Sequence, residues 1–332
     1  MKVAIIGAGN NAQGHAQSLA QIEDVAVVGI ADLSEDRAQA LSAEVGATPF
    51  GDYRSMLDEA KPDAVWICTP CWCHAEQAIA SMQAGIHVMC EKPMALSLSD
   101  CDRMISAAID NNVKLMVDQS TRYSPSLLEL KRIFESGQCG DLVNSWSIRQ
   151  SYHHVRPGSE WRLEGDQSGG IVFEWEVHEI DFVCSIGGDV SEVYARIAYS
   201  REEAPTFLDH FSAILTFKNG GYANLEASQS CTVPQSGRGF MGTRGAAQTK
   251  GRDTIQLRTL GMEKPDTIQI PPDAHASQGL GRFTPNSDFI QAIQNNQPSP
   301  IPGEDARKNI EIGLAIIESG KTGNVIQLPL TE

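Results

Sequence analysis

The stretch VAIIGAGNNAQGHAQSLA, residues 3–20, joins an apolar run to a helical pattern through a glycine turn. Its G-x-G-x-x-A pattern falls on Gly7, Gly9 and Ala12, which suit a tight turn, close approach of a pyrophosphate and close packing of helix on strand, respectively. The N–H groups at the helix start, where Asn10 and Asn11 lie, would face the phosphates. Taken alone, the pattern also fits an ordinary tight turn, but its place between strand and helix favours a dinucleotide site.

The next apolar run ends in GIADLSEDRA and carries an acidic companion to the glycine turn. Asp32 follows Gly7 by 25 residues, close to the position where a carboxylate accepts a hydrogen bond from a ribose 2'-hydroxyl. A carboxylate there would repel a 2'-phosphate, so we expect NAD as the cofactor rather than NADP. Arg37 could receive such a phosphate and is kept as a cofactor candidate, although at this spacing we expect it to point outward from its helix.

Apolar runs alternate with helical patterns through the first 120 residues. Strands are predicted for the runs at 3–7, 25–31, 64–69, 87–90 and 113–118. Helical spacing separates them, as at 34–46, and Ser97 with Asp100 three residues on predicts the start of another helix. This alternation predicts βαβ units and a parallel sheet, and therefore a Rossmann domain over residues 1–120.

Longer segments with period-two alternation characterise the second half of the chain, at 142–152, 190–200 and 211–228. Within the last of them, Asn219 and Gly220 separate two alternating runs, which is a strong hairpin signal. Helices are predicted from Ser124 and Pro125 and over 304–319, with a short strand near 325–328. We therefore predict an α/β protein whose second domain, residues 121–332, is α+β with a largely antiparallel open sheet and serves substrate binding and oligomerisation.

The composition excludes some classes of partner. The 332 residues carry a formal net charge of −16, whereas nucleic acid and anionic membranes both need basic patches. No apolar run reaches the roughly 18 residues of a membrane span. The chain enters a strand directly after its first methionine, which leaves no room for a signal peptide, so we expect a cytoplasmic protein.

The eight cysteines are scattered and mostly flanked by apolar residues, which suits reduced, buried thiols better than a disulfide framework. Cys68, Cys71, Cys73 and His74 form a cluster that invites a zinc interpretation. Structural zinc ligands usually come as one CxxC pair answered by a second pair, and the sequence has no such second pair. We therefore expect no metal.

The decapeptide HVMCEKPMAL, residues 87–96, places Glu91, Lys92 and Pro93 directly after a predicted buried strand. Charged side chains at such a place are costly unless they have partners. Ligands of open α/β sheets bind outside the carboxyl ends of the strands, so this loop and the loop TPCWCH, residues 69–74, should both border the nicotinamide. The alternative is an exposed ion pair just past a strand.

These motifs together resemble those of the glucose-fructose oxidoreductase and inositol dehydrogenase family (Gfo/Idh/MocA). The resemblance covers essentially the whole chain and rests on the joint spacing of Gly7, Gly9, Ala12, Thr69, Pro70, His74, Gly85, His87, Val88, Glu91, Lys92 and Pro93. It implies that Lys92 is the active-site lysine near the substrate hydroxyl and the nicotinamide, and that Glu91 helps to hold the cofactor ribose. Thr69, Pro70 and His74 join the cofactor candidates. A homo-dimer or homo-tetramer formed through the C-terminal sheet is also implied.

A second candidate segment, SGGIVFEWEVHEIDFVCSIGG, residues 168–188, is predicted to form one α-helix after a glycine pair. Residues at i, i+4, i+7 and i+11 form two neighbouring stripes, the polar one being Glu174, His178, Asp181 and Ser185 and the apolar one Phe173, Val177, Ile180 and Cys184. A lone histidine on such a helix is more often structural than catalytic.

The family resemblance extends to this segment, because family enzymes carry G-G-x-x-x-D-x-x-x-H-x-x-D here, with its Asp and His in the active site. The chain departs from the pattern at Glu174, where Asp is usual, and at Glu176, where a small residue is common, and it matches at Gly169, Gly170, His178 and Asp181. By resemblance His178 is the general base and Lys92 polarises the same hydroxyl. Glu174 would orient His178, Lys92 or a substrate hydroxyl, and its extra methylene leaves the substrate open.

Other polar and aromatic residues suit a sugar, whose C–H faces stack on aromatic rings and whose hydroxyls take charged partners. The candidate substrate residues are Arg122, Tyr123, Trp161, Arg162 and Asp181. A surface arginine and a core tryptophan are an equally open interpretation of these positions. SYHHVRP adds the weaker candidates His153, His154 and Arg156.

These features predict an NAD-dependent dehydrogenase of a sugar, a polyol such as an inositol, or a sugar derivative, with Lys92, His178 and Glu174 as its catalytic residues. Two alternatives stay open. One is a non-catalytic dinucleotide-binding regulator with the same fold, because fold alone does not fix function. The other is a reductase of an aldehyde or imine, which uses the same hydride geometry.

Overall fold

The computed structural model describes residues 1–155, 158–271 and 283–330, which divide into two compact units. Unit 1 contains residues 1–120 and 283–307, and unit 2 contains the described residues of 121–271 and 308–330. The segment 283–307 is therefore part of unit 1, although the sequence analysis places it in the second domain.

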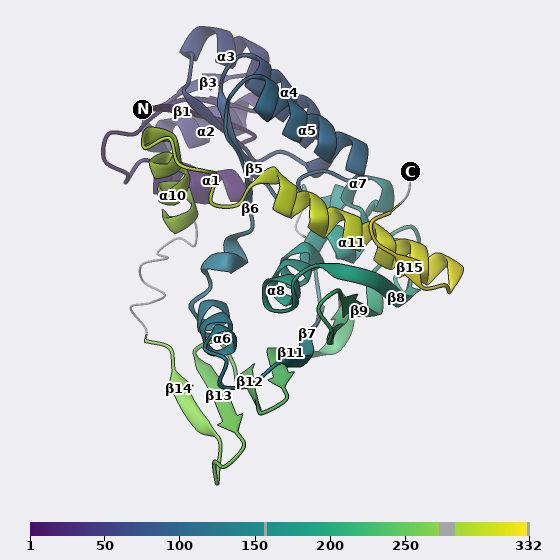
Figure 1. Ribbon diagram of the computed structural model, residues 1–332. Coiled ribbons are helices and arrows are strands. Elements are labelled where there is room, and N and C mark those ends of the chain that lie inside the picture. The colour runs from purple at the N-terminus through teal and green to yellow at the C-terminus, as the bar shows by residue number, and fades with distance from the viewer. Residues whose placement is uncertain (156–157, 272–282, 331–332) are drawn as a thin grey trace. The chain divides into compact units, whose positions relative to one another are not determined.

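Unit 1 is built on a parallel sheet in the order β3-β2-β1-β4-β5-β6 (Figure 1). The order changes direction between β1 and β4, and ligands of such sheets bind at the carboxyl ends of the strands next to this point. Every predicted strand of this half is present, and the short edge strand β3 was not predicted. The strands are β1 (Lys2–Ile6), β2 (Ala26–Ala31), β3 (Thr48–Phe50), β4 (Ala64–Ile67), β5 (His87–Glu91) and β6 (Leu115–Asp118).

Helices lie on both sides of this sheet (Figure 1), with α1 beside α2 and α10, and α4 beside α5. Local signals explain where several of them begin: the Ser97 hydroxyl accepts from the Asp100 N–H at 3.1 Å, which confirms the predicted cap. The helices are α1 (Asn10–Leu19), α2 (Glu35–Val45), α3 (Tyr53–Ala60), α4 (His74–Gln83), α5 (Leu98–Asp110) and α10 (Phe283–Gln294), with a 3-10 turn η1 (Cys71–Cys73).

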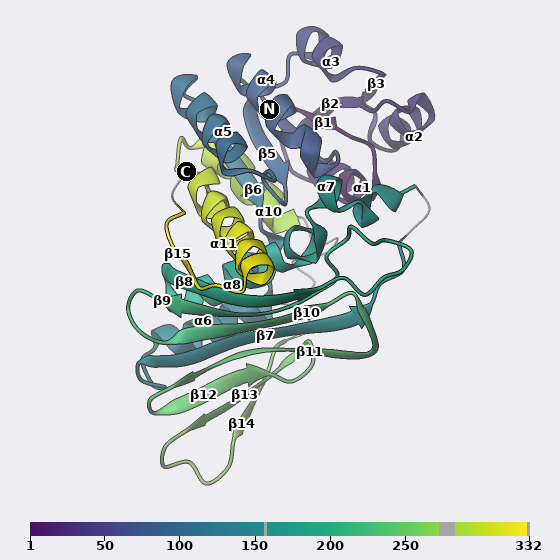
Figure 2. The same cartoon turned by 90° about the vertical axis from the view of Figure 1, so that its right-hand side faces the viewer.

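Unit 2 is built on a second sheet in the order β14-β13-β12-β11-β7-β10-β9-β8-β15 (Figure 2). All its pairs are antiparallel except the parallel pair β7 and β10, and the predicted hairpin joins β9 to β10. The strands are β7 (Leu142–Tyr152), β8 (Val190–Ala198), β9 (His210–Phe217), β10 (Tyr222–Ser228), β11 (Ser230–Gly242), β12 (Gly245–Thr249), β13 (Thr254–Thr259), β14 (Asp266–Gln269) and β15 (Ile326–Gln327).

The helical part of unit 2 differs from the prediction in one respect. The segment expected to be one α-helix starts with a π-helical turn, η4 (Val172–Glu176), and only then continues as α8 (Val177–Gly187). A π turn holds more residues than an α turn, so the predicted i, i+4 relation between Glu174 and His178 does not hold across it. The other elements are η2 (Ser120–Tyr123), α6 (Pro125–Glu135), η3 (Glu160–Leu163) and α7 (Gly165–Ser168), and α11 (Gly303–Thr322) contributes to both units.

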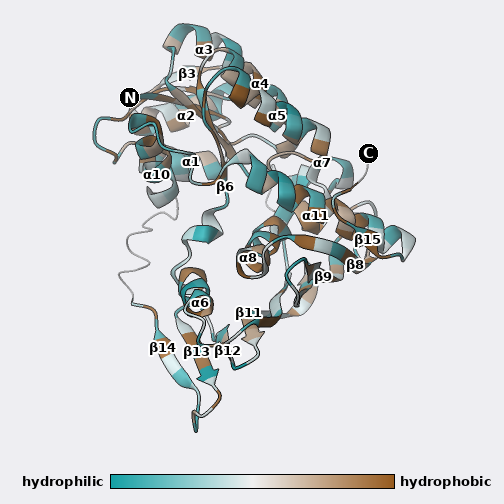
Figure 3. Cartoon of the chain, in the orientation of Figure 1, coloured by the Kyte–Doolittle hydropathy of each residue, from teal (hydrophilic) through white to brown (hydrophobic). Residues whose placement is uncertain are grey.

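The buried residues of each unit are mostly apolar. Figure 3 colours the apolar residues brown along the strands and helices. In unit 1 the strands β1, β4 and β6 are almost wholly buried, as expected for a parallel sheet covered on both sides. In unit 2 β9 alternates between buried and more exposed residues, which fits a sheet covered on one face. Among the described residues, no helix is both long and apolar enough to cross a membrane.

Candidate active site

The glycine turn between β1 and α1 has the geometry expected of a phosphate-binding turn. A Cβ at Gly7, whose φ is +96°, would lie 2.9 Å from the carbonyl carbon of Cys68, so only glycine fits against the end of β4. A Cβ at Gly9 would meet no atom within 4 Å, which leaves open space beside the backbone. No side chain caps the N-terminus of α1, and Ala12 is fully buried. The first N–H groups of α1, from Asn10 and Asn11 onward, are therefore arranged to receive an anion.

Asp32 lies next to this turn at the end of β2. Its carboxylate accepts hydrogen bonds from the backbone N–H groups of Ala8 and Ser34, both at 2.8 Å. The Arg37 side chain is 60% exposed, as expected of one that points outward from its helix, and its guanidinium donates to Asp32 at 2.7 Å. Burial raises the pKa of Asp32, but the Arg37 contact and the two backbone bonds lower it more, so the pKa lies below its usual value.

His74 connects the two loops that follow β4 and β5. Its ring nitrogens lie 2.9 Å from the backbone oxygen of Thr69 and 2.9 Å from that of Pro93. The side chain is almost fully buried, and this burial lowers the pKa of His74. Pro70 directly precedes η1 and lies between Thr69 and His74, the two residues whose contact holds this loop in place. We therefore assign His74 to the positioning of both loops. Thr69 lies at the carboxyl edge of the sheet, and its hydroxyl donates to Gln77 at 2.6 Å.

Glu91 is the last residue of β5, and Lys92 follows it at the same edge of the sheet. The register of β5 on β6 places Glu91 opposite Asp118, so two buried acidic residues lie side by side. Lys92 is half-buried and precedes a cis peptide bond to Pro93. The glycine turn, Asp32 and Lys92 thus all lie at the carboxyl ends of β1, β2 and β5, which is where the sequence predicts a cofactor site.

In unit 2, two consecutive residues of η2 contact successive turns of α8. Thr121 Oγ1 lies 3.3 Å from His178 Nδ1. Arg122 donates to both carboxylate oxygens of Asp181, at 2.7 and 2.6 Å, and Asn309 donates to the same carboxylate at 2.9 Å. Asp181 is only 3% exposed, and these contacts hold Arg122 and Asn309 against α8.

Glu174 and Arg162, both predicted site residues, form an ion pair in which the Arg162 guanidinium donates to a Glu174 oxygen. The same guanidinium lies over the ring of Trp161, 4.5 Å from its centroid. Trp161 and Tyr123 are both half-buried. Glu174, Arg162 and Trp161 therefore form one cluster, and the side chain that replaces the usual aspartate is directed to an arginine.

Sequence reasoning missed a buried charge cluster on the other side of the same helix. Glu179 accepts from Arg238 at 2.6 and 2.5 Å and from the Ser147 hydroxyl at 2.7 Å. Glu176, in the π turn, is fully buried and neither of its oxygens has a hydrogen bond. Burial, followed by the charge of Glu179, raises the pKa of Glu176 well above its usual range. Glu179, directly after His178, was the visible signal, but its partners Ser147 and Arg238 lie on the distant strands β7 and β11.

The weaker candidates lie in separate contacts. His153 packs edge-on against Trp175 with ring centroids 5.1 Å apart, and His154 packs on Tyr152 at 4.8 Å. Arg156 lies outside the described residues. All eight cysteines are free thiols, and burial raises the pKa of Cys90 and Cys73. Among the described residues, the ligand atoms of three potential metal-binding groups converge at His15, Glu91 and Asp118, and not at the cluster of Cys68, Cys71, Cys73 and His74.

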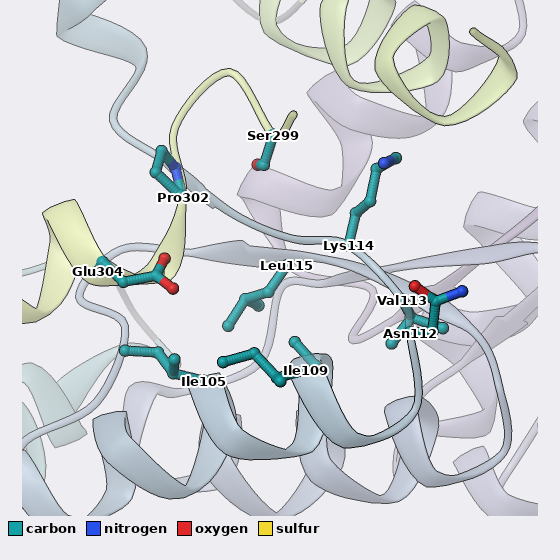
Figure 4. Close-up of a pocket in the computed structure, with 11 residues that line it drawn as sticks. Ile105, Ile109, Asn112, Val113, Lys114, Leu115, Ser299, Pro302 and Glu304 are labelled. Atoms are coloured by element: carbon teal, nitrogen blue, oxygen red, sulfur yellow. The ribbon is translucent and has the colours of Figure 1, made fainter. Parts of the chain in front are cut away.

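Unit 1 also contains a pocket of about 330 Å³ at the opposite edge of its sheet (Figure 4). Ile105, Ile109 and Leu115 point toward one another at its centre, and Lys114 and Glu304 extend at its margin. Because Lys114 and Leu115 lie at the amino end of β6, this pocket is remote from the glycine turn and from Lys92. It contains none of the predicted site residues, and we assign it no role in the chemistry.

Comparison with known proteins gives matches along most of the chain. A family model described as "Oxidoreductase family, NAD-binding Rossmann fold" matches residues 1–119, and one described as "GFO/IDH/MocA C-terminal domain" matches residues 127–248. The myo-inositol 2-dehydrogenase of Thermotoga maritima is 26% identical over 339 residues, which cover 96% of this chain and 96% of the relative.

Two solved structures have the same fold over nearly their full lengths. Levoglucosan dehydrogenase in complex with NADH and L-sorbose matches with a TM-score of 0.90 at 22% identity, over 100% of this chain and 99% of that one. The WlbA dehydrogenase from Bordetella pertussis in complex with NADH and UDP-GlcNAcA matches with a TM-score of 0.89 at 24% identity, over 100% and 98%. At these identities the likeness shows the fold.

Proposed function

Because the chain belongs to the Gfo/Idh/MocA family of oxidoreductases, we propose that it is an NAD-dependent dehydrogenase that oxidises a hydroxyl group of a sugar, a polyol or a sugar derivative. The observation that carries the proposal is Lys92, at the carboxyl end of β5 in a unit whose glycine turn and Asp32 have dinucleotide-binding geometry. The relative that acts on myo-inositol and the structural neighbour solved with L-sorbose support a polyhydroxylated substrate.

The residues of unit 1 fit the proposed cofactor. The open space at Gly9 and the uncapped start of α1 suit a pyrophosphate, and the Asp32 carboxylate suits a ribose with a free 2'-hydroxyl. Glu91 would hold the other ribose, next to Lys92. When bound, NAD⁺ supplies the hydride acceptor, and the chain itself needs no redox-active group.

Proton transfer is assigned to His178 and Lys92. The His178 ring is held through Nδ1 by Thr121, and if Nδ1–H donates to the Thr121 hydroxyl, the lone pair on Nε2 can accept the substrate proton. Lys92 would donate a hydrogen bond to the oxygen on which negative charge develops. In this assignment Thr121 sets the tautomer of the base.

The cluster of Glu174, Arg162 and Trp161 would recognise the rest of the substrate. A guanidinium over an indole presents a charged donor and an aromatic face together, which suits a ring with several hydroxyls. Because Glu174 is paired with Arg162, we propose that it shapes substrate preference through that arginine rather than orienting His178. The same pairing is the observation that favours the alternative of a non-catalytic regulator.

We also propose that the chain forms a homo-dimer or homo-tetramer through the outer face of the second sheet. Ile214, Tyr222 and Met241 lie on β9, β10 and β11, with β7 between the last two strands, and are 46%, 39% and 42% exposed. Their side chains alternate with buried neighbours, so they share the uncovered face. A monomeric mass in light scattering would contradict this proposal.

The test of function is NAD⁺ reduction over a panel of sugars, inositols and sugar acids with the wild type, Lys92→Ala and Lys114→Ala. Lys114 is the matched control, because it lies in the same unit at the opposite end of the strands. We expect the wild type to oxidise at least one member of the panel. Lys114→Ala should react at the wild-type rate, and Lys92→Ala should react more slowly by a factor of about 10² or more. No turnover with any member, despite NADH binding, would favour the regulator, and normal turnover by Lys92→Ala would remove Lys92 from the chemistry.

A further inference from the structure

His15, on α1, lies in a buried hydrogen-bond network that the proposed reaction does not use. Its Nδ1 is 2.8 Å from Asn286 Oδ1, and its Nε2 is 3.3 Å from Glu91 Oε1 and 3.6 Å from Asp118 Oδ2. His15, Glu91 and Asp118 are 1%, 5% and 1% exposed. The network therefore joins α1 and α10 to the carboxyl ends of β5 and β6, within unit 1.

Trp66 determines the direction of the hydrogen bonds in this network. The indole N–H of Trp66 can only donate, and it lies 2.9 Å from Asn286 Oδ1. The amide nitrogen of Asn286 donates to the Ser18 hydroxyl at 3.0 Å, which fits the same orientation of the amide. Asn286 Oδ1 is thus an acceptor toward His15 as well, and His15 Nδ1 carries a proton.

The other ring nitrogen faces two carboxylates. The parallel register pairs Glu91 with Asp118, so two acidic side chains lie together in a buried place. With Nδ1 already protonated, an unprotonated Nε2 would present a lone pair to both carboxylates, which is repulsive. A proton on Nε2 removes that repulsion and converts the 3.3 Å contact into a charge-assisted hydrogen bond to Glu91.

We propose that His15 is a positioning residue of the cofactor site: it carries protons on both ring nitrogens and donates from Nε2 to Glu91. This bond fixes the Glu91 carboxylate at the end of β5, directly before Lys92, and Asn286 holds the His15 ring through Nδ1. This inference deepens the proposed function and rests on the assignment of Glu91 to the cofactor. It also gives the segment 283–307, through Asn286, a part in cofactor binding.

Two substitutions separate positioning from packing. In His15→Gln the terminal amide can still donate toward Glu91 but loses the Nδ1 position, whereas in His15→Asn the amide reaches only the Nδ1 position. Each removes one buried hydrogen bond, so each should lower the melting temperature to a similar extent. We expect the Kd for NADH, measured by fluorescence titration, to rise about tenfold in His15→Asn and by less than about threefold in His15→Gln. Equal weakening by both variants, or weakening that follows the loss of melting temperature, would overturn the inference.

Glu91→Gln distinguishes this inference from the proposal on which it rests. We expect it to weaken NADH binding in the wild type and to add little in the His15→Asn background, because the contact is already lost. If Glu91→Gln leaves the Kd unchanged, Glu91 does not bind the cofactor and the inference about His15 fails with it. The dehydrogenase proposal would still stand on the Lys92 variants.

Two measurements on the wild-type protein remain decisive even if a variant does not fold. A long-range ¹H–¹⁵N correlation spectrum should show His15 with a proton on each ring nitrogen, and a bare Nε2 would refute the assignment. Elemental analysis of the purified protein should show less than stoichiometric metal. One equivalent of zinc or another divalent cation, released by mutation of His15, would show that the three groups hold a metal instead.

Discussion

Arg238→Met should show how strongly the buried charge cluster of Glu176 and Glu179 depends on one arginine. Arg238 lies on β11 and makes two hydrogen bonds to Glu179, a residue of α8 next to His178 that is only 1% exposed. Burial raises the pKa of Glu179, but Arg238, Arg149 and Ser147 lower it more, to about 2 against an ordinary value of 4.5. The variant should therefore be less stable, and its loss of stability should depend on pH.

The magnitude follows from this pKa difference. A pKa lowered in the folded state stabilises the protein above the unfolded pKa, and the stabilisation is lost as the pH falls through the folded pKa. A difference between 4.5 and about 2 corresponds to roughly 3 kcal/mol at pH 6 and roughly 1 kcal/mol at pH 3. The value at pH 6 agrees with the roughly 3–5 kcal/mol usually lost when one partner of a buried pair is removed.

The assay is urea denaturation of wild type, Arg238→Met and Arg258→Met between pH 3 and pH 7. Arg258 is an exposed arginine on β13 of the same sheet, and its loss should change the free energy of unfolding by less than about 0.5 kcal/mol. We expect the difference between wild type and Arg238→Met to be at least twice as large at pH 6 as at pH 3. A difference that does not vary with pH would refute the reasoning, because it would show that the Glu179 charge is not what Arg238 stabilises.

Three further predictions test other parts of the site. Glu176→Gln should stabilise the protein at pH 7 and flatten the dependence of its unfolding free energy on pH above pH 5. The reason is that burial raises the pKa of Glu176 in the folded state, so stability falls as the pH rises above the unfolded pKa. Urea denaturation at several pH values checks this, and an unchanged pH dependence would contradict it. Asp32→Ser should lower the ratio of the Kd for NADPH to the Kd for NADH by about tenfold in fluorescence titrations. If the wild type binds NADH and NADPH with equal affinity, Asp32 does not repel the 2'-phosphate. Thr121→Val should lower kcat roughly tenfold without changing the Kd for NADH, because only the hydroxyl can hold His178 Nδ1. Thr121→Ser keeps the hydroxyl and should restore kcat, so equal rates in the two variants would exclude that role.

Local signals in the sequence were sufficient for most of the fold. The glycine turn at Gly7 and Gly9, the Ser97 cap and the Asn219-Gly220 hairpin each depend on residues within a few positions of one another, and each is present as predicted. The placement of Lys92 at the carboxyl edge follows from the same local pattern, because parallel strands end at one edge.

The parts that could not be predicted depend on contacts between distant residues. His15 and Asn286 are 271 positions apart, and Arg238 and Glu179 are 59 apart, so no local pattern links them. The π turn before His178 is also set by packing, since helical periodicity alone does not show an inserted residue.

The most direct test of the central claim follows the hydrogen that leaves the substrate carbon. The best substrate from the panel, deuterated at the carbinol carbon, would be incubated with NAD⁺ and the wild type, Lys92→Ala or His178→Ala, and the reduced cofactor analysed by mass spectrometry. We expect one deuterium per reduced cofactor with the wild type, and a rate lower by about 10² or more in both variants with their affinity for NADH retained. Reduced cofactor without deuterium, or transfer at the wild-type rate by both variants, would contradict the central claim.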